Sequence, residues 1–316
     1  MAEARTSVYD VLRLTGLLLA TALATSRLGL LAHELAGHGG TATVLGGRIR
    51  HVELFWFAGG WIEYDFASPP SIAARLAISM GGIAIELVVG AALWFAIRGD
   101  SLGRKVLRAV GAVLVVHASW YLATGAWHGF GDGHLLRELL GERRYPLALA
   151  AGALACFAGF FGARRIVGPL AATQRRHPLI QLVIAAALAG GAMVGLAQGE
   201  LWLRRDATYS EIMKPEPARR VDQKLAQWAE YERTHGGTIT PEQQTAERVR
   251  LERVYHEFPF KWLLAACAIA AILAGAWLAL RAGVSHAALP RSTLVRATAT
   301  AAIGLAAVIA IDLVTR

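Results

Sequence analysis

Long apolar stretches recur along the whole chain and alternate with shorter charged segments. A helix needs about 20 predominantly apolar residues to cross a bilayer. Stretches near that length are found at 10–39, 72–97, 106–126, 146–163, 178–198, 262–281 and 293–314. The first is interrupted by Arg27, so it fits either one long tilted helix or a helical hairpin. The pattern predicts a mainly α polytopic membrane protein with seven or eight transmembrane helices.

Residues 47–66 break this pattern because their apolar positions lack helical spacing. Ile62, Tyr64 and Phe66 alternate with acidic residues, which is the period of a half-buried strand. A pair of glycines separates this arm from a second β-prone arm, and the tryptophans and tyrosine nearby suit a membrane boundary. We therefore predict a small β-hairpin near 47–66, at the edge of the membrane.

Residues 199–260 form a second break, because they are charged and contain no apolar stretch long enough to span. Val221 and Leu225 begin a helical repeat of apolar positions. Thr240 and Gln243 have the spacing of a capping box, with a proline at the first helical position between them. The segment is therefore predicted to be a water-exposed helical insertion between two membrane spans.

Composition supports a membrane protein of the multi-pass class, located in the cell membrane and in contact with the lipid bilayer. The 316 residues are 55% hydrophobic and 17% charged, against about 25% charged in an average soluble domain. The net charge of +9 comes from loops between apolar stretches, which indicates membrane topology and not a nucleic-acid partner. Both cysteines lie in apolar stretches, which excludes a disulfide framework and a thiolate metal cluster.

The strongest candidate for chemistry is the run from His33 through Glu34 to His38, with the sequence HELAGH. In the common zinc-hydrolase motif, two histidines at i and i+4 point about 40° apart on a helix, so both bind one ion. His33 and His38 are separated by i and i+5, about 140° on a regular α-helix. A π-type bulge, which is frequent at functional sites, realigns them. We predict metal binding by both histidines and a departure from α geometry around 35–37.

A catalytic zinc site needs a third protein ligand and a position open to water. Asp132 is the preferred candidate because the glycines around it let the backbone approach a metal ion. The alternative is that Asp132 only caps the helix that follows it. His128 and His134 are weaker candidates. Glu86, an acid within an apolar stretch, has three open roles: a protonated side chain, a partner of the nearby arginine or of a histidine, or a group that orients a ligating histidine.

Together these segments resemble the site-2 protease family of intramembrane zinc metalloproteases. The likeness rests on HELAGHG at 33–39, SMGGIAIELVVG at 79–90, GDGHLLREL at 131–139 and the predicted hairpin, and it covers roughly residues 10–165. It implies that His33, His38 and Asp132 are zinc ligands and that Glu34 is the general base. It further implies that the substrate is a membrane protein or peptide, cleaved by metal-activated water in or beside the bilayer.

The resemblance divides the chain into a metalloprotease-like membrane core at 1–170 and additional transmembrane helices at 171–316, which include the insertion. The chain departs from the family in its HExxGH spacing, which has one residue more between the histidines. That spacing is similar to the zinc motif of the dipeptidyl peptidase III family, so the extra residue is compatible with zinc. No segment beyond residue 170 resembles the family.

Two other function classes stay open. One is a metal-dependent membrane hydrolase that acts on a lipid or another small substrate. The other is a non-catalytic membrane protein with a structural metal site, which a fourth protein ligand such as His134 or Glu86 would favour. The sequence leaves the substrate and the oligomeric state open.

Orientation in the membrane is also open. The loops at 98–108 and 164–176 carry the most lysine and arginine. The positive-inside rule places them in the cytoplasm and places the hairpin, the Asp132 loop and the insertion on the other side. The resemblance instead implies an active site nearer the cytoplasm.

Overall fold

The computed structural model describes residues 2–174, 177–282 and 288–315 and is mainly helical. Among these residues, seven helices are long and apolar enough to cross a membrane, as the sequence predicts. Their cores are α1 (Ala2–Leu31), α3 (Ile72–Ala96), α4 (Leu102–His128), α6 (Arg144–Ala171), α7 (Pro178–Arg204), α11 (Phe260–Arg281) and α12 (Arg291–Thr315). The chain is a multi-pass integral membrane protein that contacts the lipid bilayer.

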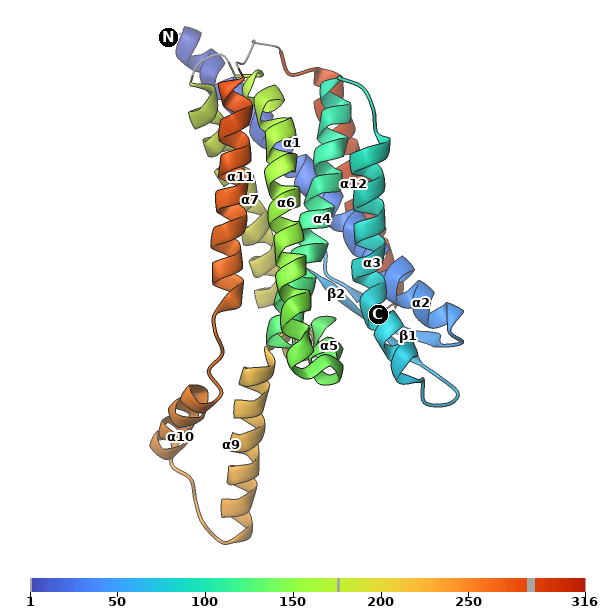
Figure 1. The fold of residues 1–316 in the computed structure, drawn as a ribbon, viewed down its shortest axis with the longest axis vertical. Helices are drawn as coiled ribbons and strands as arrows, with labels where there is room; N and C mark the ends of the chain where they lie inside the picture. The colour runs from blue at the N-terminus through green and yellow to red at the C-terminus, as the bar shows by residue number, and fades with distance from the viewer. Residues whose placement is uncertain (1, 175–176, 283–287, 316) are drawn as a thin grey trace.

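The first apolar stretch is one continuous helix, not a helical hairpin. After α1 it continues through η1 (Ala32–Gly39) and α2 (Gly40–Val44), so that the apolar span covers Val8–Val44. It crosses the bundle obliquely, with α7 and α12 packed against it (Figure 1). The length of this helix places the HELAGH run near its end, beside the hairpin.

Helices α4, α6 and α11 form the other side of the bundle, and α3 packs on α4. Small residues line these contacts, with Ala123 and Ala126 of α4 meeting Ala148 and Ala151 of α6. Small side chains let helix backbones approach closely, which is how membrane helices gain packing energy in an apolar solvent. Large apolar side chains point outward on α7 and α11, where lipid surrounds them.

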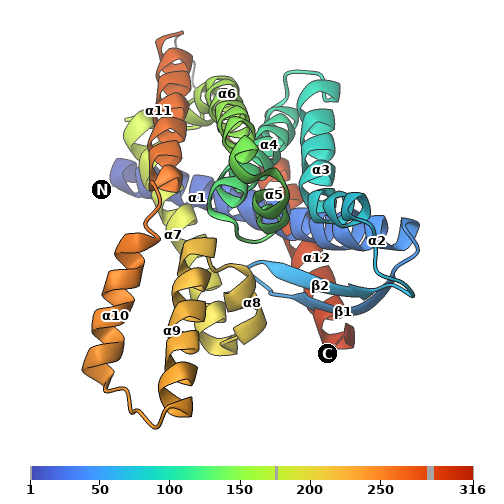
Figure 2. The same cartoon turned by 60° about the horizontal axis from the view of Figure 1, so that its bottom comes forward.

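The predicted hairpin is present. Strand β1 (Arg48–Leu54) pairs antiparallel with β2 (Gly60–Asp65), with Val52 opposite Ile62 in the register. The end of α12 covers the edge of the hairpin that β1 forms (Figure 2). There the Thr315 hydroxyl donates a hydrogen bond to the Val52 carbonyl at 2.7 Å.

The turn of the hairpin is held by two buried charges from different spans. The Arg27 guanidinium of α1 donates hydrogen bonds to the carbonyls of Phe55, Phe57 and Ala58 at 2.8–3.1 Å. The Glu200 carboxylate of α7 accepts from the N–H groups of residues 56, 57 and 58 at 2.6–3.1 Å. Each charge satisfies turn groups that would otherwise be buried without partners, so the hairpin is fixed to the bundle.

The insertion is helical, as predicted. It contains α8 (Ala207–Ile212), α9 (Glu216–Thr234) and α10 (Pro241–Val254), and the last two form a hairpin that extends away from the bundle (Figure 1). The predicted capping box is confirmed, because the Thr240 hydroxyl accepts from the Gln243 N–H and the Gln243 amide oxygen accepts from the Thr240 N–H. Val221, Leu225 and Leu251 form its small apolar core.

Helices η1 and α3 cross with their backbones in contact. A Cβ atom added at Gly37 would lie 2.5 Å from the Gly82 Cα atom. This crossing therefore has room for glycine alone at position 37, and it fixes η1 against the helix that carries Glu86.

We predict that Gly37→Ala lowers the free energy of unfolding by roughly 1–3 kcal/mol. The added methyl group would overlap backbone atoms of α3, which cannot move aside by a change of side-chain rotamer. Thermal unfolding of detergent-purified protein measures this change. Gly40→Ala is the matched control on the same turn of helix, since its added Cβ would lie 3.6 Å from the nearest atom. Equal stability of the two variants would mean that the crossing tolerates a side chain.

Candidate metal centre

The helix that carries the two histidines leaves α geometry where the sequence predicts it. Residues Ala32–Gly39 form a π-type helix, inserted between α1 and α2. A π-helix joins residue i to residue i+5 through the backbone, so side chains five apart lie one above the other. His33 and His38 are both buried and turn to the same side. The extra residue in the HExxGH spacing is therefore absorbed by the backbone.

His33, His38 and Asp132 come together in one buried group that could hold a metal ion. The His33 Nε2 atom lies 3.1 Å from His38 Nε2 and 3.0 Å from Asp132 Oδ2. The His38 Nε2 atom lies 3.2 Å from Asp132 Oδ1. Ligand atoms at 2.0–2.1 Å from a tetrahedral ion are separated by about 3.3 Å. The two imidazole nitrogens and the two carboxylate oxygens of Asp132 thus lie close enough together to hold such an ion.

The outer nitrogen of each imidazole fixes which atom faces the centre. His38 Nδ1 lies 2.7 Å from the Ile78 carbonyl oxygen, which only accepts, so Nδ1 carries the proton. His33 Nδ1 lies 3.1 Å from Glu86 Oε1 and donates to that carboxylate. In the neutral imidazoles both Nε2 atoms therefore present lone pairs toward the carboxylate of Asp132. The two lone pairs and the carboxylate repel one another at this distance unless a proton or a metal ion lies between them.

Asp132 occupies the N-cap position of α5 (Gly133–Leu140), but its side chain turns into the cluster instead of capping the helix. The Ser79 hydroxyl donates to the Asp132 carbonyl at 2.7 Å and fixes the backbone at this point. Burial raises the pKa of the Asp132 carboxyl, whereas protonated His38 and His33 imidazoles would lower it through their charge and hydrogen bonds. Metal ions bind the ionised form of a carboxylate.

Glu86 positions His33. Its carboxylate bridges His33 Nδ1 and, through Oε2, the Nδ1 atom of His117 at 2.8 Å. Among the roles that the sequence left open, the structure selects the partner of a histidine, while Arg27 holds the hairpin turn. The His117 contact was not predicted, because nothing in the sequence relates that histidine to the HELAGH run.

The two weaker ligand candidates lie outside the group. His128 pairs with Glu257 at 3.3 Å, and His134 lies 3.7 Å from Glu216. Within the described part of the chain the cluster has three protein members, and His134 and Glu86 are not among them. This is the number of protein ligands typical of a site with one position left open.

The insertion holds the loop that carries Asp132. The Gly131 N–H donates to the Ile212 carbonyl at 3.0 Å, and Arg219 donates to the Gly129 carbonyl at 2.5 Å. On the other side of the loop, Glu257 forms an ion pair with Arg137 in α5. Burial favours a higher pKa for Glu257, but the His128 and Arg137 partners lower it, so this acid stays charged. These contacts were not predicted, because the sequence indicates only a water-exposed helical insertion at 199–260.

Glu34 lies beside the cluster and is buried. Its carboxylate interacts electrostatically with His33, His38 and Asp132, yet no described side chain hydrogen-bonds to it. A buried acid of this kind in a membrane span is costly and is typical of a functional site.

We predict about one transition-metal ion per chain in protein purified in detergent without chelator, as measured by elemental analysis. His33→Ala, His38→Ala and Asp132→Ala should each lose the ion, because each removes one of the three side chains of the group. His134→Ala, two residues from Asp132 and outside the group, is the control that keeps it. A wild-type protein without metal, or equal metal content in all four variants, would contradict the assignment.

Comparisons with known proteins do not identify a family, because no family model, no curated protein and no solved structure matches the chain. The function is therefore argued from the geometry of the His33, His38 and Asp132 cluster and from Glu34.

Proposed function

We propose that this protein is an intramembrane zinc metalloprotease that cleaves a membrane-embedded or membrane-adjacent peptide. The observation that carries the proposal is the meeting of two imidazoles and one carboxylate beside the buried Glu34. His33, His38 and Asp132 would hold the ion, and Glu34 would act as the general base. The resemblance to site-2 proteases agrees with each of these roles.

Zinc fits the donor set because two imidazoles and one carboxylate are a usual catalytic zinc set with one open position. Iron(II) also accepts two histidines and one carboxylate. The glutamate directly after the first histidine favours zinc, since this pair is typical of hydrolytic zinc helices. When bound, the ion supplies a Lewis acid that activates water and polarises the scissile carbonyl.

The residues of the chain would then handle the protons. Glu34 takes one proton from the attacking water as its oxygen bonds to the carbonyl carbon, and it delivers that proton to the leaving nitrogen as the C–N bond breaks. Glu86 holds His33 in the tautomer that keeps Nε2 free, and the Ile78 carbonyl does the same for His38. Neither group needs to move during the reaction.

A peptide substrate is favoured by the position of the hairpin. A helical segment hides its carbonyls in backbone hydrogen bonds and must be extended before attack. Strand β2 contacts η1, and its Tyr64 interacts electrostatically with Asp132, whereas β1 is covered by α12. An extended segment added along β2 would lie next to the cluster, in the manner of β-augmentation.

We predict that Glu34→Gln keeps the metal and the fold but lowers turnover about 10²–10⁴-fold, because it removes the proton acceptor. Mass spectrometry of newly formed peptide N-termini, in membranes that contain either form, measures the loss. Glu252→Gln, which changes an exposed acid on α10 away from the cluster and the hairpin, is the control that retains activity.

The same membranes separate the rival functions. Loss of lipid hydrolysis products in Glu34→Gln, with no change in peptide N-termini, would replace the protease by a lipid hydrolase. Identical peptide and lipid profiles for the wild type and Glu34→Gln would instead favour a structural metal site.

A further inference from the structure

A pocket lies at the end of the bundle away from the candidate metal centre. Its volume is about 410 Å³, and it lies where α3 ends and α4 begins, whereas α5, the hairpin and the insertion lie at the opposite end (Figure 1). Side chains from α3, α4, α6 and the loop between α3 and α4 line it: Trp94 and Phe95 from α3, Arg98 from the loop, Lys105 and Arg108 from α4, and Arg165 from α6.

Four of the lining side chains are positively charged, and little negative charge balances them. Lys105 lies 4.0 Å from Asp100, whose side chain is 97% exposed, so this pair is weak. Within the described residues no acidic side chain forms an ion pair with Arg98, Arg108 or Arg165. The pocket therefore has a net positive charge that a bound anion would neutralise.

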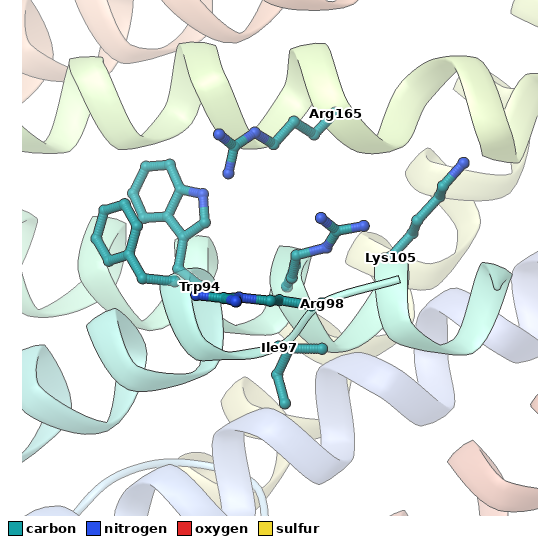
Figure 3. Close-up of a pocket in the computed structure, with 7 residues that line it drawn as sticks. Trp94, Ile97, Arg98, Lys105 and Arg165 are labelled. Atoms are coloured by element: carbon teal, nitrogen blue, oxygen red, sulfur yellow. The ribbon is translucent and has the colours of Figure 1, made fainter. Parts of the chain in front are cut away.

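Two of the arginines, Arg108 and Arg165, have contacts that leave donors free. Arg108 donates from Nη2 to the Gly99 carbonyl at 2.8 Å. The Arg165 guanidinium lies 5.9 Å from the centre of the Trp94 ring and reaches from α6 toward Arg98 across the pocket (Figure 3). Guanidinium groups arranged in this way match the oxygen atoms of a phosphate group.

Aromatic surface adjoins the charged pocket. Trp94 is buried and stacks on Phe95 with ring centres 5.4 Å apart, and Phe95 is 67% exposed. These rings mark the end of a membrane span, which is the depth of lipid headgroups. An acyl chain could lie along Phe95 while the headgroup enters the pocket.

We propose that this pocket binds the phosphate headgroup of an anionic phospholipid. Basic pockets between transmembrane helices bind such headgroups, and the volume lies in the range of ligand sites. The positive-inside rule places the loop at 98–108 at the cytoplasmic leaflet, where anionic lipids concentrate. A bound lipid would join α3, α4 and α6 at the end of the bundle opposite the metal centre.

Titration of the full-length protein in detergent with fluorescent phosphatidylglycerol tests the proposal. Arg98→Gln combined with Arg165→Gln should weaken binding roughly 25-fold, at about fivefold for each cation removed. Arg164→Gln combined with Arg291→Gln removes the same charge at this end, outside the lining residues, and should bind within twofold of the wild type. Equal weakening in both double variants would overturn a specific pocket.

Two further arms identify the ligand. Phosphatidylcholine with the same acyl chains should bind at least tenfold more weakly, and millimolar inorganic phosphate or glycerol phosphate should leave phosphatidylglycerol binding unchanged. Displacement by either soluble phosphate would assign the pocket to a soluble anion, and equal binding of phosphatidylcholine would assign it to acyl-chain contact. Unchanged thermal unfolding and metal content in the Arg98 and Arg165 double variant confirm that its fold is intact.

Discussion

Two imidazole nitrogens and the two carboxylate oxygens of Asp132 meet at 3.0–3.2 Å in the interior of the protein, and much of the surrounding structure positions these atoms. In a medium of low dielectric their mutual repulsion is strong, and a cation between them converts it into attraction. The outer nitrogens of both imidazoles are hydrogen-bonded to acceptors, which orients both Nε2 atoms toward Asp132. The group could therefore hold a metal ion.

Several independent structural features hold the two histidines and Asp132 together. The π-type turn places His33 above His38, and the Gly37–Gly82 backbone contact presses η1 against α3. Asp132 comes from a loop held on one side by the insertion and on the other by Glu257, so an element far from the HELAGH run determines where the third group lies. The insertion thereby contacts the loop that carries Asp132.

Much of the fold was predictable from local sequence patterns. The length of the apolar stretches predicted the membrane spans, the alternation of apolar and acidic residues predicted the β-hairpin, and the capping box predicted the start of α10. The i, i+5 spacing predicted the π-type turn because a regular helix would separate the histidines. Long-range contacts were not predictable: Arg219 binds a backbone carbonyl 90 residues away, and carbonyls carry no sequence signal. Glu86 stayed ambiguous for a similar reason, since its choice between Arg27 and His33 depends on how α1 and α3 cross.

The coordination of the bound ion tests the central claim most directly. X-ray absorption at the zinc edge, on full-length protein purified in detergent, reports the number and type of ligands. The proposed function predicts four-coordinate zinc with two imidazole nitrogens and oxygen ligands, all at about 2.0–2.2 Å. A spectrum with one imidazole, with sulfur, or with six oxygen ligands would contradict the assignment of His33, His38 and Asp132.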